Sequence, residues 1–306
     1  KFFEAHLLLA LNSLKNKDYK KSKDYLQKTY EFIEDDKFAL IITETLKQYL
    51  YVFEEKKIPN KKKNYGNLSF INEAFQRCYI NDKNTKNYYE KIINNKNNDE
   101  YSRYIFFYIN YLIENNKYEE AKKITNNLKY LNSSLLISQG KKWIENKKLK
   151  EFQKIFSCKN SSDIVSEFFF LVANLYSSEN DYERSNFYLN ISRYLNPKFL
   201  FNLSLLAENY YLNEDYFSAS NVLKSFDKQS DFYYWFKIKK EAQIILKQKN
   251  ADSSLEYINS KFKKIKNPSI KIIFDMANFN KNAKKYKEAI LYYSQVLLQI
   301  DENSSL

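Results

Sequence analysis

Small and apolar residues recur at constant distances from a series of tyrosines in the second half of the chain. Around Tyr182, one small residue lies nine positions earlier at Ala173, another lies three positions later at Ser185, and an apolar residue follows at Leu189. On two consecutive helices, small residues at these positions would face each other and let the axes approach closely. The pattern therefore predicts a helix pair, with the tyrosine opening the second helix and wedging between neighbouring pairs.

The same pattern returns after 34 or 35 residues. Its later origins are Tyr216, Ala251 and Tyr286, so the spacings from Tyr182 onward are 34, 35 and 35. A fixed period of this size is typical of a solenoid of stacked helix pairs. The matching small residues are Ala207 with Ala219, Ala242 with Ser254, and Ala277 with Ala289.

The first half of the chain keeps this frame less strictly. Tyr19 has small residues in both positions, at Ala10 and Ser22. Tyr118 and Leu149 each lose one of them, because Ile109 and Phe152 stand in their places. The 99 residues from Tyr19 to Tyr118 are close to three periods, so two degenerate repeats are expected there.

This frame resembles the tetratricopeptide repeat, a helix pair of about 34 residues. Tyr176 and Tyr210 match the tyrosine of that family's first helix, and Pro197 matches its terminal proline. The resemblance implies an all-α, right-handed α-solenoid that acts as a non-catalytic protein–protein interaction scaffold. Its partner, a peptide or protein segment, would lie in the concave groove formed by the first helices or dock on an end. Frame and composition also resemble multi-repeat proteins of uncharacterised role from low-GC alphaproteobacteria.

Two regions are expected along the chain. Residues 1–99 would hold repeats with a degenerate stretch near 58–99, and residues 100–306 would form a regular array. Because the chain begins at Lys1 and residues 301–306 would open another helix, we expect a fragment whose array continues. The expected helices are 3–15, 18–33, 37–57, 67–80, 84–95, 100–115, 118–131, 133–146, 148–157, 163–179, 182–195, 198–212, 216–227, 230–248, 251–265, 269–283 and 286–300.

Asparagine is expected to close many of the first helices, because the chain has only 2 glycines. Asn adopts the left-handed conformation that ends a helix more readily than other non-glycine residues. The candidates are Asn16, Asn116, Asn180 and Asn213. The aspartates Asp18, Asp181 and Asp215 would cap the second helices.

The formal net charge of +13 raises a second hypothesis, that of a single-stranded RNA-binding helical repeat similar to pentatricopeptide proteins. Arginine, the side chain that matches phosphate and base edges best, occurs only at Arg77, Arg103, Arg184 and Arg193. The lysine surplus is instead typical of coding by an AT-rich genome, and nucleic acid is an unfavoured partner. A lysine run at 61–63 is interpreted as a solvated loop.

Catalytic and metal-binding motifs are missing from the sequence. His6 is the one histidine, and Gly66 and Gly140 are too isolated to build a phosphate loop. Cys78 and Cys158 lie 80 residues apart without a C-x-x-C spacing, so we expect two small apolar side chains rather than a disulfide. No enzyme activity, cofactor or metal is expected. No stretch approaches the ~20 apolar residues of a membrane span, and a bacterial cytoplasmic or periplasmic location is left open.

The first helices supply the expected groove. One first-helix position carries an amide in four repeats, which could pair with any extended peptide backbone. Phenylalanine recurs one turn earlier, although Asn and Phe are also simply abundant in this chain. The candidate partner-binding residues are Phe106, Asn110, Phe170, Asn174, Tyr211, Lys239, Gln243, Phe274, Asn278 and Lys281.

Overall fold

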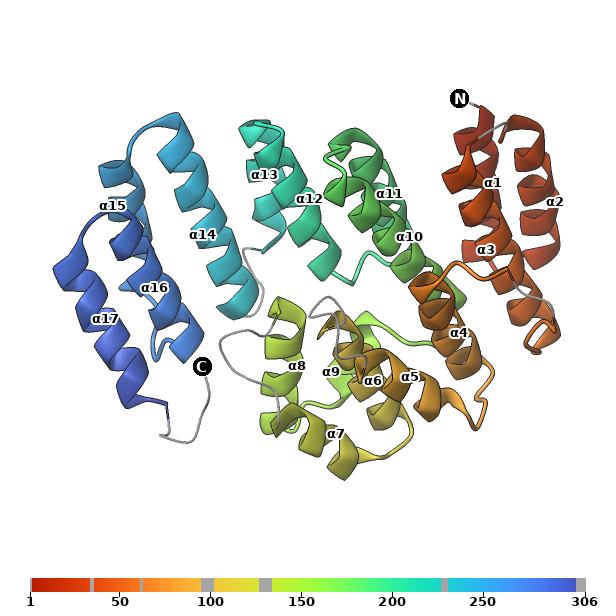
Figure 1. Cartoon of the computed structure of the whole chain (residues 1–306), viewed down its shortest axis with the longest axis horizontal. Helices are drawn as coiled ribbons and strands as arrows, with labels where there is room; N and C mark the ends of the chain where they lie inside the picture. The colour runs from red at the N-terminus through yellow and green to blue at the C-terminus, as the bar shows by residue number, and fades with distance from the viewer. Residues whose placement is uncertain are drawn as a thin grey trace. The chain divides into compact units, whose positions relative to one another are not determined.

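The computed structural model describes residues 2–33, 36–60, 63–94, 102–126, 134–226 and 231–300. Seventeen α-helices, packed in adjacent pairs, and no β-strand occur in these residues, which confirms the all-α class (Figure 1). The expected lysine loop lies largely outside them, since Lys61 and Lys62 are not described. The same holds for the ends of several expected helices, at residues 95, 100–101, 127–131, 133, 227 and 230.

The chain forms two compact units whose limits differ from the expected division at residue 99. Unit 1 comprises residues 1–121 and 148–202, and unit 2 comprises residues 122–147 and 203–306. The helices of unit 1 are α1 (Phe2–Lys15), α2 (Tyr19–Thr29), α3 (Lys37–Glu55), α4 (Asn67–Tyr79), α5 (Thr85–Ile93), α6 (Ser102–Glu114), α9 (Lys150–Ile155), α10 (Ser161–Ser178) and α11 (Tyr182–Leu195). Those of unit 2 are α8 (Leu135–Glu145), α13 (Tyr216–Leu223), α14 (Asp231–Gln248), α15 (Ala251–Phe262), α16 (Ile270–Asn282) and α17 (Tyr286–Leu298). The helices α7 (Tyr118–Asn126) and α12 (Phe201–Leu212) begin in unit 1 and end in unit 2.

The small residues of the frame lie where the two helices of a pair meet. Ala207, Ala219, Ala277 and Ala289 are at most 3% exposed. Where the second position is a serine, its hydroxyl donates to the carbonyl oxygen of the small residue twelve positions earlier. These bonds are Ser22 to Ala10 at 2.8 Å, Ser185 to Ala173 at 2.7 Å and Ser254 to Ala242 at 2.7 Å. The predicted close approach is therefore confirmed in both units.

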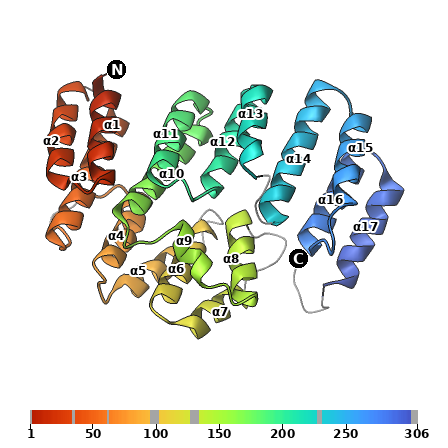
Figure 2. The same ribbon diagram turned by 180° about the vertical axis from the view of Figure 1, so that it is seen from behind.

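Packing in unit 1 does not follow the order of the sequence. The pair α10 and α11 lies beside α1 and α3 (Figures 1 and 2). Lys15 donates to the backbone oxygen of Tyr194 at 2.6 Å, and the Tyr194 hydroxyl lies 2.6 Å from Oδ1 of Asn12. The rings of Tyr49 and Phe168 lie 6.2 Å apart. This pair therefore makes contacts with helices far from it in the sequence, which a solenoid stacked strictly in chain order would not have.

The weak part of the frame has a structural cause. Between the pairs α1/α2 and α4/α5 lies α3, a 19-residue helix that packs on both α2 and α4. Its inner side is apolar, with Ile42, Leu46 and Phe53 at most 1% exposed. One helix pair and one long helix occupy the interval in which two degenerate repeats were expected.

The turns within the helix pairs occur at a constant position in the repeat frame, although the residue type at that position varies. A positive φ occurs two residues before the frame origin at Lys17, Asn116, Lys147, Asn180, Glu214 and Lys284. Asn116 and Asn180 were predicted correctly. Asn16 and Asn213 were not, because the left-handed residue is the next one along, lysine or glutamate. The aspartate caps are confirmed at Asp18, Asp181 and Asp215, each accepting from a backbone N–H three residues later at 3.0–3.1 Å.

The tyrosines that open the second helices do not share one role. Tyr19 contacts other helices, through its hydroxyl 3.2 Å from Ser161 and its ring on Phe53. Tyr118 and Tyr286 are 43% and 60% exposed, so the expected wedge between pairs is wrong for them. Separately, none of the described helices is both long enough and apolar enough to traverse a bilayer.

Candidate functional site

The candidate residues of unit 2 lie along the first helices of three consecutive pairs. Tyr211 is on α12, Lys239 and Gln243 are on α14, and Phe274 and Asn278 are on α16. All five are half-buried, whereas Lys281 at the end of α16 is exposed. Together these six residues form a set that we term the first-helix face.

Contacts between neighbouring helices hold this face together. Lys240 on α14 bonds Glu208 on α12 at 2.5 Å and lies 4.4 Å above the ring of Tyr211. On the other side of α14, Asp275 of α16 accepts from Nε1 of Trp235 at 2.8 Å and pairs with Lys239 at 3.0 Å. The side chains of α12, α14 and α16 are thus fixed relative to one another by cross-helix bonds.

The first-helix face carries lysine charges and an amide oxygen that has no hydrogen-bond donor. Burial lowers the pKa of Lys271, an effect that Asp275 opposes and Lys239 reinforces. The Oε1 atom of Gln243 is buried and has no hydrogen-bond partner among the described residues. A buried acceptor without a donor costs free energy, so the half-buried Gln243 would gain if its side chain turned outward and accepted from an N–H of a ligand. On α16, Oδ1 of Asn278 accepts from the Tyr293 hydroxyl at 2.7 Å.

The candidate residues of unit 1 do not form such a face. Phe106 is fully buried, Phe170 is 6% exposed and Asn110 is 2% exposed. Phe106 stacks on Phe152, and Asn110 donates to the backbone oxygen of Phe156 at 2.8 Å. These three residues are core side chains and cannot line a groove as expected. Of the four candidates in unit 1, Asn174 alone is exposed.

A buried ion pair occupies the place of the expected lining in unit 1. Arg103 is 7% exposed and bonds both carboxylate oxygens of Glu167, at 2.7 and 2.6 Å, as well as Oδ1 of Asn202 at 2.8 Å. Its guanidinium lies 3.7 Å from the ring centre of Phe170 and 4.6 Å from that of Phe201. Burial raises the pKa of Glu167, and the charge and hydrogen bonds of Arg103 oppose that shift. The sequence analysis did not find this pair, because Arg103 and Glu167 lie 64 residues apart and no local spacing connects them.

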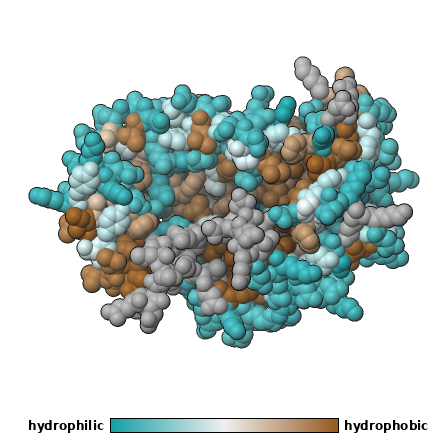
Figure 3. Space-filling view, in the orientation of Figure 1, coloured by the Kyte–Doolittle hydropathy of each residue, from teal (hydrophilic) through white to brown (hydrophobic). Residues whose placement is uncertain are grey.

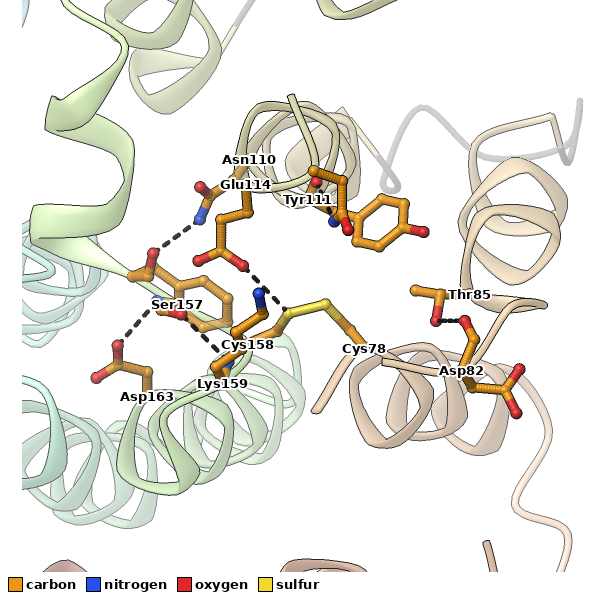
Figure 4. The surroundings of a disulfide bond; sticks show 12 residues. Cys78, Asp82, Thr85, Asn110, Tyr111, Glu114, Ser157, Cys158, Lys159 and Asp163 are labelled. Atoms are coloured by element: carbon orange, nitrogen blue, oxygen red, sulfur yellow. Dashed lines mark hydrogen bonds between the residues drawn. A yellow bond between two sulfur atoms is a disulfide. The ribbon is translucent and has the colours of Figure 1, made fainter. Parts of the chain in front are cut away.

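Cys78 and Cys158 form a disulfide, which corrects the expectation of two independent apolar side chains (Figure 4). Their Cα atoms lie 5.8 Å apart, within the range that a disulfide requires. The bond joins the end of α4 to the connection between α9 and α10. Sequence spacing gave no sign of it, because the packing within unit 1, and not proximity in the chain, brings the two cysteines together.

Carboxyl groups surround this disulfide. Oε2 of Glu114, the last residue of α6, lies 3.8 Å from Sγ of Cys158. Burial raises the pKa of Glu114, while a hydrogen bond from Ser157 and the charge of Lys159 lower it. Burial also raises the pKa of Asp163 to about 6, although Asp163 accepts from the Ser157 backbone N–H at 2.9 Å.

Apolar side chains also gather on the outside of α17 (Figure 3). Ile290, Leu291, Leu297 and Leu298 are 62–87% exposed. In the preceding pair, Leu255 and Phe262 occupy the positions equivalent to Ile290 and Leu297 and pack against the core formed with α16. The same side of the preceding second helix, α15, is covered by its neighbours, whereas on α17 it is exposed.

No protein-family model matches this chain, and no curated protein matches it. The arguments on function below therefore depend on the residues and their packing.

Proposed function

We propose that this protein is a non-catalytic helical-repeat scaffold of the tetratricopeptide type, which binds an extended peptide or protein segment along the first-helix face of unit 2. The observation that carries the proposal is the continuous set of half-buried aromatic, amide and lysine side chains on α12, α14 and α16. Gln243, whose buried Oε1 lacks a donor, lies in the middle of it. Such mixed surfaces suit a peptide that offers backbone N–H groups and apolar side chains.

The recurring contact between the two helices of a pair supports a solenoid. The serine-to-carbonyl bonds and buried alanines recur at 34 or 35 residues, so neighbouring pairs would present their first helices in the same way. Lys281, which is exposed at the end of α16, would attract an acidic group on the partner, and Phe274 would receive an apolar side chain.

Charge pairing disfavours the RNA-binding hypothesis. On α14, Lys237, Lys239 and Lys240 each lie within 3.4 Å of a carboxylate oxygen. Lysines that are already neutralised release fewer counterions on meeting a phosphate backbone, which weakens the main source of non-specific affinity.

The proposal is tested with a random peptide library displayed on phage and selected on the immobilised full chain, followed by titration of a selected peptide. Gln243→Ala and Phe274→Ala should each weaken binding about tenfold, which corresponds to ~1.4 kcal/mol. Gln295→Ala removes an exposed amide from the second helix α17 and should leave the affinity unchanged.

Two outcomes would contradict the proposal. One is a peptide whose affinity is insensitive to both face variants. The other is a chain that selects no peptide but binds single-stranded RNA with an affinity that falls steeply with salt.

A further inference from the structure

Three potential metal ligands converge in unit 1 from elements far apart in the sequence. Cys78 lies near the end of α4, Glu114 ends α6, and Cys158 lies before α10 (Figure 4). The two cysteines are 2% and 3% exposed, and Glu114 is half-buried. One ligand atom from each residue lies within 4.8 Å of the other two.

The position of Glu114 is poorly suited to the disulfide form. Its Oε2 lies 3.8 Å from a sulfur that, in a disulfide, has no hydrogen to donate. The carboxyl group is also half-buried at the C-terminal end of α6, where the helix dipole disfavours negative charge. Among the described residues no lysine or arginine forms an ion pair with it, and only Ser157 and the more distant Lys159 compensate. A cation between the carboxylate and the sulfurs would satisfy all three groups.

We propose that Cys78, Cys158 and Glu114 bind a zinc ion when the disulfide is reduced. Zinc bonds of ~2.3 Å to sulfur and ~2.0 Å to oxygen in a tetrahedron place sulfur and oxygen about 3.5 Å apart and the two sulfurs about 3.8 Å apart. The Glu114 oxygen is already 3.8 Å from Cys158 Sγ. Only the sulfurs have to separate, which rotation about the cysteine side-chain bonds permits. Because Glu114 is half-buried, the fourth position is open to water.

The conversion of the disulfide form into the reduced, zinc-bound form conserves electrons and protons. A dithiol reductant supplies two electrons and two protons, the S–S bond breaks, two thiols form, and the reductant becomes a disulfide itself. Zinc then displaces the two thiol protons to solvent and is held by two thiolates and one carboxylate. A small-molecule disulfide would act as the oxidant in the reverse direction: it accepts two electrons and becomes a dithiol, the S–S bond re-forms and the ion is released. The site is independent of any partner on the first-helix face.

The experiment compares the reduced and oxidised full chain. Reduced, metal-free protein should take up one equivalent of zinc in competition with a chromogenic chelator. Cobalt in place of zinc should give the ultraviolet charge-transfer band of thiolate ligation. The same protein with its disulfide intact should bind neither ion at this site, which makes the oxidised wild type a control that needs no substitution.

Variants then assign the ligands. Cys78→Ser should reduce the cobalt charge-transfer band, because only the Cys158 thiolate remains, and Glu114→Gln should weaken zinc affinity at least ~10-fold. Glu55→Gln changes another glutamate at the end of a unit 1 helix, an exposed one, and should have no effect. The proposal is overturned if the reduced wild type binds no zinc, if the oxidised form binds it equally well, or if Glu114→Gln matches Glu55→Gln.

Discussion

Unit 1 and unit 2 use the same helix-pair geometry but are held together by different interactions. In unit 2, the helices from α12 to α17 follow one another in sequence, α8 packs on α14, and a core around Trp235, Ile258 and Met276 joins α14 to α17. In unit 1, the pair α10/α11 packs beside α1 and α3, and an aromatic core encloses the Arg103–Glu167 ion pair. Unit 1 also carries the disulfide. The period of small residues therefore determines how two helices of a pair meet, whereas other residues decide which pairs become neighbours.

The largest expected effect is at the buried ion pair. Arg103→Met should lower the free energy of unfolding by about 3–5 kcal/mol, because Glu167 would be left as an unpaired buried charge. Without Arg103, only burial would act on Glu167 and its folded-state pKa would rise further. Stability of the variant should then be greatest at low pH and fall as pH rises through that pKa, so its deficit is smaller in acid.

Urea titrations followed by circular dichroism would measure this loss. Both tryptophans, Trp143 and Trp235, belong to unit 2, so their fluorescence should change little if the units unfold separately. Adding Glu167→Met should recover most of the stability, and Lys154→Met at an exposed pair should cost under ~1 kcal/mol. An equal loss in both signals would show that the units unfold together.

The disulfide is expected to have the next largest effect. It closes a loop of 80 residues, and removing such a bond should cost about 2–4 kcal/mol. Reduction with excess chelator present should lower the urea midpoint of the dichroism signal and leave the tryptophan signal of unit 2 nearly unchanged. The double variant Cys78→Ala, Cys158→Ala should behave like the reduced protein, and should not respond to reductant. A reduced protein as stable as the oxidised one would contradict the assignment of this bond as a crosslink of unit 1.

Overfilling the helix contact in unit 2 is the third test. Ala277 is fully buried against α17, so Ala277→Leu should force the two helices apart and cost about 1–3 kcal/mol. Here the tryptophan signal should report the loss. Ala251→Leu, at an exposed position of α15, serves as control and should be nearly neutral. Equal effects of the two substitutions would mean that the small residues do not set the helix spacing.

The smallest expected effect comes from two serine substitutions, which compare the units most directly. Ser185→Ala in unit 1 and Ser254→Ala in unit 2 each remove one hydroxyl donor to a helix carbonyl, at about 1 kcal/mol. Because alanine already occupies this position at Ala219 and Ala289, both variants should fold normally. Thermal unfolding of the two should give costs within a few tenths of a kcal/mol. A clearly larger cost in one unit would show that the frame geometry is not shared.

The sequence predicted the helices and their pairing because those depend on local spacing. The facing positions of Ala173 and Ser185, the caps at Asp18 and Asp181, and most helix limits all follow from residues within one repeat. It could not predict the neighbours of α10, since nothing in the 34-residue period distinguishes stacking in order from packing against α1. For the same reason it assigned Phe106, Asn110 and Phe170 to a groove although they lie in the core, and missed the Cys78–Cys158 bond.

The residues of positive φ in the turns within the helix pairs have a practical consequence for the design of more thermostable variants. Lys17, Lys147, Glu214 and Lys284 hold a backbone shape that costs an L-residue with a Cβ about 1 kcal/mol relative to glycine. The lysine and glutamate side chains in these turns are exposed and make no contact with the core. Because these four side chains are exposed, glycine at each position would relax the backbone and leave the buried helix contacts in place, so thermal tolerance could be raised one turn at a time.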